Sequence, residues 1–370
     1  MKYLMVRRRD CIAGMLGAGW AHRMMAMNLK RDRLEEAAAL IEKSAKSGEI
    51  SAASLYVAQG NFVFQRAFGR APEPDSVFLL ASITKPMTAI GAMILVDRGQ
   101  LSLSDPVRKH IPEFTGGDRD LVTIKHLLMH TSGLPDQLDE NVELRKRHAP
   151  LKDFVAATCR TPLLFRPGTQ VKYQSMGLLL AAEIAERMTK RPFREFLRDE
   201  FFRPASMLKT SLGLGGRKIA DTMLSQVASA PGLYGGGDSG KDWNWNSTYW
   251  RDLGAPWGGA HSTASDVARM LRMFLEPDGK VLKRETAASM SRNQTAGLNE
   301  PWGIGWMIKP GTFGKHCSAR TFGHYGATGT IAWADPQTQL LCVFLTTKPA
   351  DESRSHLLGA VSDIVSASAV

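Results

Sequence analysis

Strand-like segments stand near both ends of this 370-residue chain, and the long stretch between them carries mostly helical patterns. Residues 51–59 and 62–68 have the pattern of strands, and Gly60-Asn61 between them is a hairpin signal. Four further strand-like segments come late in the chain, at residues 303–309, 321–324, 328–334 and 340–346. Strands contributed by both ends predict an α/β fold built on one antiparallel sheet with flanking helices, into which a helical lobe is inserted.

The segments expected to be helices show apolar residues at helical spacing or long apolar runs. The main ones are residues 33–47, 83–96, 124–129, 177–188, 193–202, 265–274 and 352–366. We therefore expect a single domain over residues 33–370. Its α/β lobe would comprise residues 33–80 and 300–370, and its mainly helical lobe would comprise residues 81–299.

The formal net charge of +11 is concentrated at the N-terminus, where residues 1–32 hold seven Lys/Arg and two Asp/Glu. Arg7-Arg8-Arg9 precede a short, weakly apolar segment and resemble a twin-arginine export signal, which predicts a periplasmic or cell-envelope protein. A disordered basic N-terminus on a cytoplasmic protein is the alternative. The apolar segment is too short for an integral membrane helix. Elsewhere no Lys/Arg stripe alternates with aromatic residues, so no nucleic-acid partner is expected.

The tetrapeptide Ser82-Ile83-Thr84-Lys85 opens the apolar helix predicted at residues 83–96. Residues three apart share one face of a helix, so Ser82 and Lys85 can face the same cavity. Pro86 is tolerated only in a first helical turn, which fixes the helix start close to Ser82. A lysine among apolar neighbours loses its proton more readily, and a helix N-terminus favours the negative charge of an attacked carbonyl. The pattern indicates a nucleophilic serine with a lysine base; a capping serine beside a solvated lysine is the alternative.

Three other patterns suggest chemistry that the sequence does not support. Residues 235–241 begin like a phosphate-binding loop, but Asp242 replaces the required Ser or Thr. His126 and His130 have the spacing of zinc ligands, yet the glutamate of a zinc-peptidase motif is missing, and His130 is expected only to end a helix. The chain has no Gly-x-Ser-x-Gly motif, which argues against an α/β-hydrolase. Its four scattered cysteines indicate neither a zinc ribbon nor a disulfide framework.

Two further segments accompany the serine tetrapeptide. Tyr173-Gln174-Ser175 follows a Pro-Gly turn, and His324-Tyr325-Gly326-Ala327 lies at the end of a predicted strand. In order and approximate spacing, the three segments resemble the Ser-x-x-Lys, Tyr-x-Asn and (Lys/His)-x-Gly motifs of the serine β-lactamase and penicillin-binding-protein superfamily. The resemblance covers about residues 33–365. It is closest to the branch of class C β-lactamases, D-alanyl-D-alanine carboxypeptidases, D-aminopeptidases and family VIII carboxylesterases.

The resemblance implies a role for each motif residue. Ser82 corresponds to the nucleophile that forms an acyl-enzyme, and Lys85 corresponds to its general-base partner. Tyr173 corresponds to the tyrosine that passes a proton to the leaving group and helps to activate water for deacylation. No metal and no organic cofactor is implied.

The remaining motif positions flank the site, and two of them differ from the β-lactamase pattern. The resemblance places His324 and Gly326 beside the site and assigns the oxyanion hole to the backbone N–H groups of Ser82 and Ala327. Ser175 stands where asparagine usually hydrogen-bonds the acyl-amide side chain, and His324 stands where β-lactamases hold the substrate carboxylate with lysine. Histidine is only partly charged at pH 7, so we expect weak, pH-dependent carboxylate binding and poor penicillin hydrolysis.

A glycine-rich stretch with four tryptophans, residues 213–257, is expected to form a hydrophobic wall over the site, although packing within a long loop is the alternative. We therefore expect a serine hydrolase that acts through an acyl-enzyme on small esters or D-amino-acid amides. A D-alanyl-D-alanine carboxypeptidase or a β-lactamase is the alternative enzyme. An inactive protein that binds cell-wall peptides or β-lactams is the non-enzymatic alternative. In each case the partner is a small ester, amide or peptide.

Overall fold

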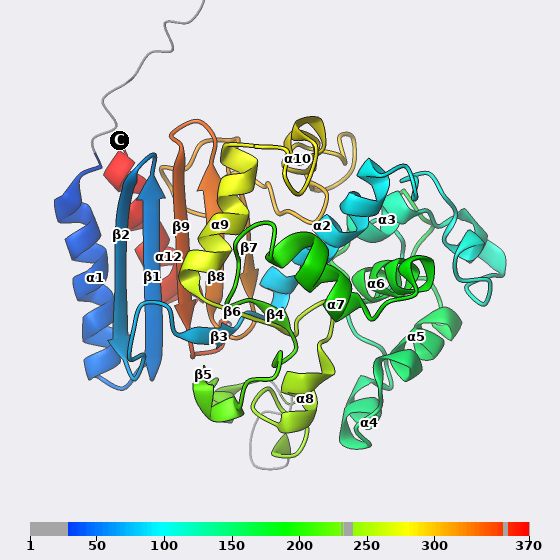
Figure 1. Cartoon of the computed structure of the whole chain (residues 1–370), viewed down its shortest axis with the longest axis horizontal. Coiled ribbons are helices and arrows are strands. Elements are labelled where there is room, and N and C mark those ends of the chain that lie inside the picture. The colour runs from blue at the N-terminus through cyan, green and yellow to red at the C-terminus, as the bar shows by residue number, and fades with distance from the viewer. Residues whose placement is uncertain (1–28, 231, 233–239, 351–353, 370) are drawn as a thin grey trace, which may run out of the picture.

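The computed structural model describes residues 29–230, 232, 240–350 and 354–369 of the chain (Figure 1). The export signal predicted at residues 1–32 therefore lies almost entirely outside the described residues, and so does most of the segment 235–241 that begins like a phosphate loop. In the part of the chain that is described, no helix combines the length and the apolar character needed to cross a membrane.

Within the described residues, five antiparallel strands form the main sheet, and segments near both ends of the chain contribute to it (Figure 1). The strands are β1 (Ala52–Gln59), β2 (Phe62–Gly69), β7 (Phe322–Gly326), β8 (Thr330–Asp335) and β9 (Leu340–Thr346). Their order is β2-β1-β9-β8-β7, so the last strand of the chain lies beside the first. Val57 of β1 pairs with Phe64 of β2 on one side and with Cys342 of β9 on the other. The predicted α/β fold with one antiparallel sheet from both chain ends is confirmed.

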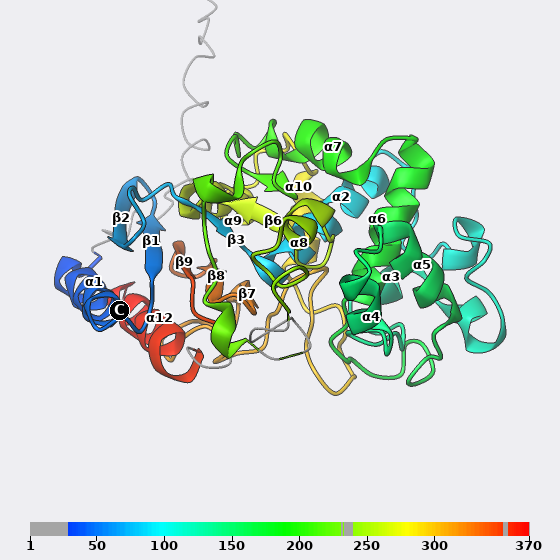
Figure 2. The same cartoon turned by 90° about the horizontal axis from the view of Figure 1, so that it is seen from below.

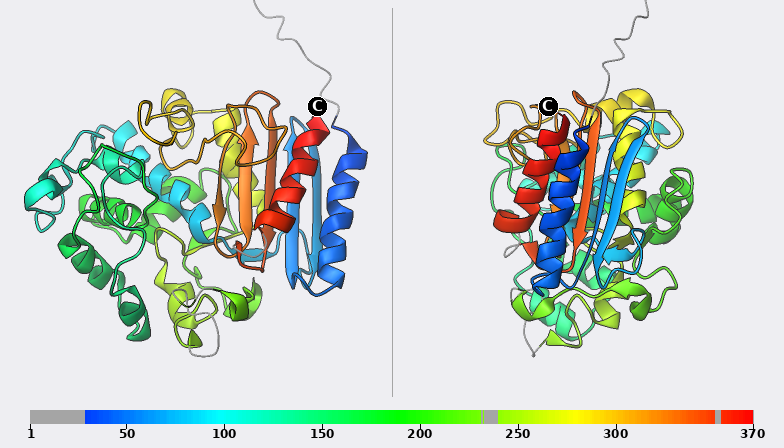
Figure 3. Two further views of the ribbon diagram at one scale, coloured as in Figure 1. Left: turned by 180° about the vertical axis from the view of Figure 1, so that it is seen from behind. Right: turned by 90° about the vertical axis from the view of Figure 1, so that its left-hand side faces the viewer.

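Helices cover both faces of this sheet (Figure 3). One face packs against α1 (Arg31–Lys46) and α12 (Gly359–Ser366), and a hydrophobic core fills the space between these helices and the strands. The other face packs against α9 (Ala264–Leu275), which buries Val267 and Leu271. The sequence places α9 in the helical lobe, but the structure makes it part of the covering of the sheet.

The prediction of a strand at residues 303–309 is wrong. Within this described segment only isolated bridges form, which join Trp302 to Met307 and Met307 to Gly323. Gly305 has a φ of 76°, and a Cβ atom on it would lie 2.6 Å from the Cβ atom of Ala89. The segment therefore passes closely over the helix that carries Ala89, and it needs a backbone turn there that a regular strand does not allow.

A second, smaller sheet supports the segment that leads to Ser82. It consists, in spatial order, of β4 (Ser211–Leu212), β6 (Ala260–Ser262), β3 (Val77–Leu79) and β5 (Thr222–Met223). Strand β3 pairs antiparallel with β6 and parallel with β5. Strands of two or three residues are too short to show an alternating pattern, so this sheet is missing from the expectations based on sequence.

The helical lobe is organised around α2 (Thr84–Asp97), a helix that is buried along nearly all of its length (Figure 1 and Figure 2). The other helices of the lobe are α3 (Ile124–Leu128), α4 (Asn141–Lys146), α5 (Leu151–Arg160), α6 (Met176–Thr189), α7 (Phe193–Leu197), α8 (Thr248–Leu253) and α10 (Arg284–Met290). At Gly91 of α2, a Cβ atom would lie 2.7 Å from Leu197 and 3.1 Å from Phe193. Glycine at this position therefore lets α7 pack closely against α2.

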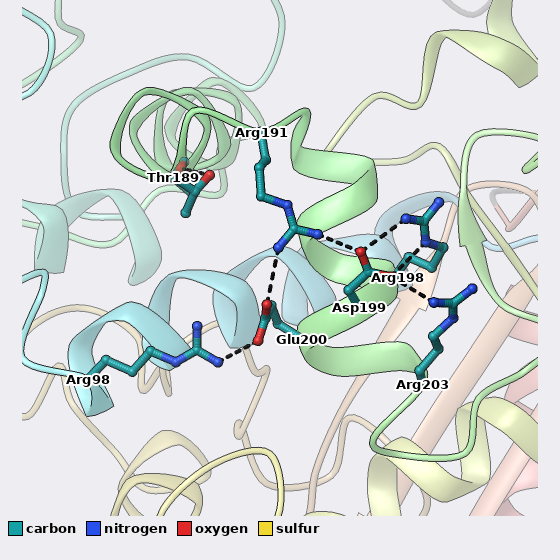
Figure 4. A network of polar contacts seen from close by, with 8 residues as sticks. Arg98, Thr189, Arg191, Arg198, Asp199, Glu200 and Arg203 are labelled. Carbon is teal, nitrogen blue, oxygen red and sulfur yellow. Dashed lines mark hydrogen bonds and ion pairs between the residues drawn. The ribbon is translucent and has the colours of Figure 1, made fainter.

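A network of ion pairs fastens the C-terminal end of α2 to the turn that follows α7 (Figure 4). Arg98, directly after α2, pairs with Glu200 at 2.5 Å, and Arg191 pairs with both Glu200 and Asp199. Asp199 also accepts hydrogen bonds from Arg198. Because these side chains are partly exposed, solvent screens each pair, and the network adds little to the stability of the fold.

Candidate active site

Ser82 lies in a 3₁₀ turn, Ala81–Ile83, that runs directly into α2. Ala81 has a φ of 47°, an uncommon conformation for a residue with a side chain. The hydroxyl of Thr84 donates to the Ala81 carbonyl at 2.6 Å and accepts a hydrogen bond from the backbone N–H of Ala260 in β6 at 3.0 Å. The small sheet thus holds the turn in place, and strained backbone of this kind is typical of functional sites.

Lys85 is buried in the first turn of α2, with its amino group beside the Ser82 hydroxyl. The Nζ atom of Lys85 donates hydrogen bonds to Ser82 Oγ and to the carbonyl oxygen of Trp257, each at 3.0 Å. Burial lowers the pKa of Lys85 to about 8, against a smaller opposing effect of the Asp136 carboxylate. Near pH 8 a large fraction of Lys85 is therefore neutral and has a lone pair for the Ser82 proton. The alternative of a capping serine beside a solvated lysine is wrong.

The ring of Tyr173 packs against Lys85, with its centroid 4.7 Å from the Nζ atom. Its centroid lies 4.9 Å from that of His130, 6.0 Å from that of His324 and 6.1 Å from that of Trp302. The structure thus brings the serine, the lysine, the tyrosine and the strand histidine of the three sequence motifs into one cluster.

Gln174 ties the Tyr173 segment to α3 and to the loop that follows it. Its side-chain Nε2 donates to the His126 carbonyl at 3.2 Å, and its Oε1 accepts a hydrogen bond from the Ser132 hydroxyl at 2.5 Å. Its backbone N–H donates to Nδ1 of His130 at 3.1 Å. The hydrogen bonds of the buried Gln174 therefore hold the neighbouring Tyr173 in position. The sequence does not reveal this role.

Gly326 lets β7 approach the Ser82 turn. A Cβ atom on Gly326 would lie 2.2 Å from the Leu80 carbonyl oxygen and 2.4 Å from Thr330 Oγ1. The Thr330 hydroxyl donates to the same Leu80 carbonyl at 2.8 Å and fastens β8 to this segment. The close approach brings Ala327, the residue after β7, to the cavity that Ser82 also lines.

Ser82 opens on a cavity of about 240 Å³. The described residues that line it include Tyr173, Ser175 and Ala327 of the predicted site. Aromatic side chains form much of its wall, namely Tyr173, Trp245, Trp250, Trp257, Trp302 and Tyr325. Three of the four tryptophans from residues 213–257 are among them, so the predicted hydrophobic wall is confirmed for these three.

The family model "Beta-lactamase" matches residues 37–365, which is most of the chain. The chain belongs to the β-lactamase family. Penicillin-binding protein 4 of Amycolatopsis lactamdurans is 31% identical over 290 residues, which cover 72% of this chain and 70% of that protein. Protein flp of Staphylococcus aureus (strain MW2) is 27% identical over 194 residues, which cover 50% of this chain and 39% of that protein. The match thus spans well under half the length of this relative.

The fold is similar to that of EstCE1, described as a hydrolase with promiscuous acyltransferase activity. The TM-score is 0.75 at 18% identity, over 91% of this chain and 99% of that chain. A penicillin-binding-protein homologue from Caulobacter crescentus gives a TM-score of 0.72 at 22% identity, over 91% and 98% of the two chains. The resemblance to the β-lactamase and penicillin-binding-protein superfamily is confirmed.

In this β-lactamase-family protein, His324 does not carry the partial charge expected from the sequence. Its side chain is fully buried, and this burial, together with nearby Lys85, lowers its pKa to about 3. Its Nδ1 lies 2.7 Å from the Tyr325 carbonyl oxygen, so the neutral ring donates a hydrogen bond from Nδ1. Among the described residues, Tyr325 lines the cavity and His324 does not. The expected attraction of a substrate carboxylate by His324 is therefore wrong, because desolvation removes its charge.

His130 is expected from the sequence only to end a helix, but it lies in the centre of the site. It is buried, and its ring packs edge-on against Trp302 with the centroids 4.6 Å apart. Burial and the charge of Lys85 lower the pKa of His130 well below its usual range, so it adds no positive charge beside the lysine. In the described ranges, no group of three or more His, Cys, Asp or Glu is arranged to hold a metal ion.

Three charged residues line the cavity without any sequence motif that points to them: Asp136, Arg145 and Glu300. Asp136 accepts a hydrogen bond from the Ser175 hydroxyl at 2.5 Å. Arg145 is buried on α4, with its guanidinium carbon 3.6 Å from the centroid of the Trp250 ring. Asp136 directly follows the specific loop at residues 130–135, which is the one signal that could have drawn attention to it.

Proposed function

We propose that this protein hydrolyses small carboxylic esters, or D-amino-acid amides, through an acyl-enzyme on Ser82. The observation that carries the proposal is the 3.0 Å contact between Ser82 Oγ and the buried Nζ atom of Lys85. A serine hydroxyl needs an adjacent base to attack a carbonyl, and a lysine whose pKa is lowered to about 8 supplies one near neutral pH.

In the acylation step, neutral Lys85 takes the Ser82 proton while Oγ forms a bond to the ester carbonyl carbon. The carbonyl oxygen becomes an oxyanion, for which the N–H groups of Ser82 and Ala327 are the proposed donors. When the oxyanion collapses, the bond to the alcohol oxygen breaks. The proton held by Lys85 passes through the Tyr173 hydroxyl to the departing alcohol, so the charges balance.

In the deacylation step, a water molecule attacks the acyl carbonyl carbon. The proton that the water loses passes through the Tyr173 hydroxyl to neutral Lys85, and Lys85 returns it to Ser82 Oγ when the acyl bond breaks. The products are a carboxylic acid and an alcohol, and the three residues regain their starting protonation states.

Three features favour small esters over β-lactams. His324 is buried and uncharged, the Ser175 hydroxyl is already engaged by Asp136, and the cavity wall is largely aromatic. A β-lactam needs its carboxylate and its acyl amide held together, and each weakened polar contact costs about 1–3 kcal/mol. A simple ester presents neither group and loses nothing.

A D-alanyl-D-alanine carboxypeptidase or a β-lactamase is the second candidate, and Arg145 favours it. A buried guanidinium that lines the cavity can bind a substrate carboxylate in place of the lysine that the strand motif lacks. The similarity to penicillin-binding protein 4 supports the same candidate.

The test compares kcat/KM for p-nitrophenyl butyrate, nitrocefin and D-alanine p-nitroanilide on wild type and Ser82→Ala. We expect the ester to exceed nitrocefin by at least about a hundredfold, which corresponds to about 3 kcal/mol. Ser82→Ala should lose all turnover. Nitrocefin hydrolysis at the ester rate would instead favour the second candidate. Acylation of Ser82 without turnover, seen by mass spectrometry, would indicate the inactive binding protein.

A further inference from the structure

The hydroxyl of Ser175 donates a hydrogen bond to a carboxylate inside the cavity. Its Oγ donates to Asp136 Oδ1 at 2.5 Å, and both side chains line the cavity on which Ser82 opens. A serine hydroxyl has a single proton, and here that proton points at Asp136. Toward a bound substrate, the pair therefore offers only oxygen lone pairs.

This arrangement removes the hydrogen-bond donors that an asparagine would offer a substrate at position 175. An asparagine side chain can donate two N–H groups to a substrate carbonyl, whereas the Ser175–Asp136 pair can only accept. A substrate carbonyl would meet repulsion there, while an N–H or ammonium group would find an acceptor with a full negative charge. Hydrogen bonds to an ionised acceptor are about twice as strong as those between neutral groups.

The charged groups that line the cavity also favour a positively charged group on the substrate. Its described lining contains two carboxylates, Asp136 and Glu300, against one guanidinium, Arg145, which is stacked on the Trp250 ring. In the state in which Lys85 is neutral and acts as a base, the carboxylates that line the cavity outnumber the cations by one, and Lys309 lies 3.9 Å from Glu300 outside this lining. The aromatic wall adds rings whose faces attract cations.

On the basis of the hydrolase activity proposed above, we propose that the Asp136 carboxylate anchors a positively charged amino group on the acyl half of the substrate. The preferred substrates are then esters of amino acids or other aminoacyl esters with a free ammonium group. The acyl half is the half concerned, because Ser175 occupies the position that the family resemblance places beside the acyl side chain. Asp136 is the residue that determines this specificity.

A matched pair of substrates tests the assignment. The 4-nitrobenzyl esters of 3-aminopropanoate and of butanoate differ only in that an ammonium group replaces a methyl group. We expect wild type at pH 7.5 to favour the ammonium ester by at least about tenfold in kcat/KM. In Asp136→Asn the ratio should fall to about one. General damage to catalysis cancels in the ratio, because both esters use the same nucleophile and base.

Three further variants make the assignment specific. Asp139→Asn makes the same chemical change at an exposed residue of the same loop, outside the cavity, and should keep the wild-type ratio. Ser175→Ala should also keep it, because the Asp136 carboxylate remains. Ser175→Asn should lower it, because it returns an amide donor to the position. If Glu300→Gln lowers the ratio of the two kcat/KM values to about one while Asp136→Asn keeps the wild-type ratio, the assignment to Asp136 is wrong.

The outcome for wild type separates this inference from the proposed function. If wild type hydrolyses both esters equally and Ser82→Ala hydrolyses neither, the ammonium anchor is wrong and the hydrolase stands. If the preference appears only when the amine is on the alcohol half, as in 2-aminoethyl butanoate against propyl butanoate, the anchor on the acyl half is wrong. If wild type cleaves no ester of either kind, the proposed function itself fails, and the anchor fails with it.

Discussion

Among single residues, Lys85 is the proposed base, so its protonation should determine the pH at which the site reacts. With its pKa at about 8, kcat/KM for p-nitrophenyl butyrate should rise with pH through about 8, as the amine loses its proton. The Asp136 carboxylate raises that pKa, so Asp136→Asn should move the rise to lower pH, while Asp139→Asn should leave it in place. Profiles measured between pH 6 and 9.5 give the shift. A rise at unchanged pH in Asp136→Asn would contradict the electrostatic coupling.

The burial of Lys85 should also lower the free energy of unfolding. Lowering its pKa from 10.5 to about 8 corresponds to about 3 kcal/mol of disfavoured positive charge in the folded protein near neutral pH. Lys85→Met fills a similar volume without a charge, so we expect a variant that is inactive yet melts at or above the wild-type temperature. Thermal unfolding and ester hydrolysis on the same preparation measure both. A large fall in melting temperature would show that the Trp257 contact of Lys85 is worth more than its desolvation costs.

His324 offers a test of the charge around Tyr173. His324→Lys would place a cation near Lys85, lower the pKa of Lys85 further and shift the ester profile to lower pH, since like charges disfavour each other. It should also raise kcat/KM for nitrocefin and narrow its gap to the ester. His324→Gln is neutral and should do neither. If the pH profile of ester hydrolysis does not shift in His324→Lys, a charge at position 324 does not affect the pKa of Lys85.

The residues that could be predicted from the sequence are those carried by local motifs. Ser82 and Lys85 are three residues apart, so helical geometry alone brings them together. The contact between Asp136 and Ser175 joins residues 39 positions apart, and no local rule predicts it. The charge of His324 depends on how completely its neighbours bury it, which only the packed structure determines.

Among elements, the approach of β7 to the Ser82 turn depends on one glycine. In Gly326→Ala the new methyl group would lie 2.2 Å from the Leu80 carbonyl oxygen, so the strand must move away. We expect kcat/KM to fall by at least about a hundredfold as the Ala327 N–H leaves the oxyanion position, since one such donor is worth about 3–4 kcal/mol. At the exposed Gly232 a Cβ atom meets no described atom within 4 Å, so Gly232→Ala should retain activity. Full activity in Gly326→Ala would remove β7 from the oxyanion hole.

The elements that could be predicted from the sequence are the long ones. Strands β1, β2, β8 and β9 and the helices α1, α2, α6 and α9 follow from their patterns and turns. The segment at 303–309 looks like a strand, but contact with α2 at Ala89 forces a turn at Gly305. The small sheet beside Ser82 could not be predicted, because its strands are set by pairing with distant residues rather than by their own sequence.

In the whole molecule, buried neutral histidines should make the fold sensitive to mild acid. Burial lowers the pKa of His261 and of His324 to about 3 and that of His130 well below 6.5. Below pH 6.5 the unfolded chain therefore binds protons that the folded protein does not, and stability falls as pH falls. Each histidine contributes up to about 1.4 kcal/mol per pH unit. Urea unfolding between pH 7 and 5 measures the slope, which His261→Gln should reduce by about one proton. A slope unchanged in that variant would contradict the assignment.

The pairing of β1 with β9 joins Ala53 to Thr346, residues from opposite ends of the chain. A ribosome releases β1 long before β9, so the sheet cannot close until β9 has been synthesised. Ser82 and Lys85 emerge before β7, which leads to Ala327 and which pairs with β8 in the sheet that β9 completes. Until β9 has been synthesised, the nascent polypeptide therefore holds the proposed nucleophile and base without the sheet that positions Ala327. We expect a product terminated before residue 340 to contain Ser82 and Lys85 but to be inactive, because it lacks β9.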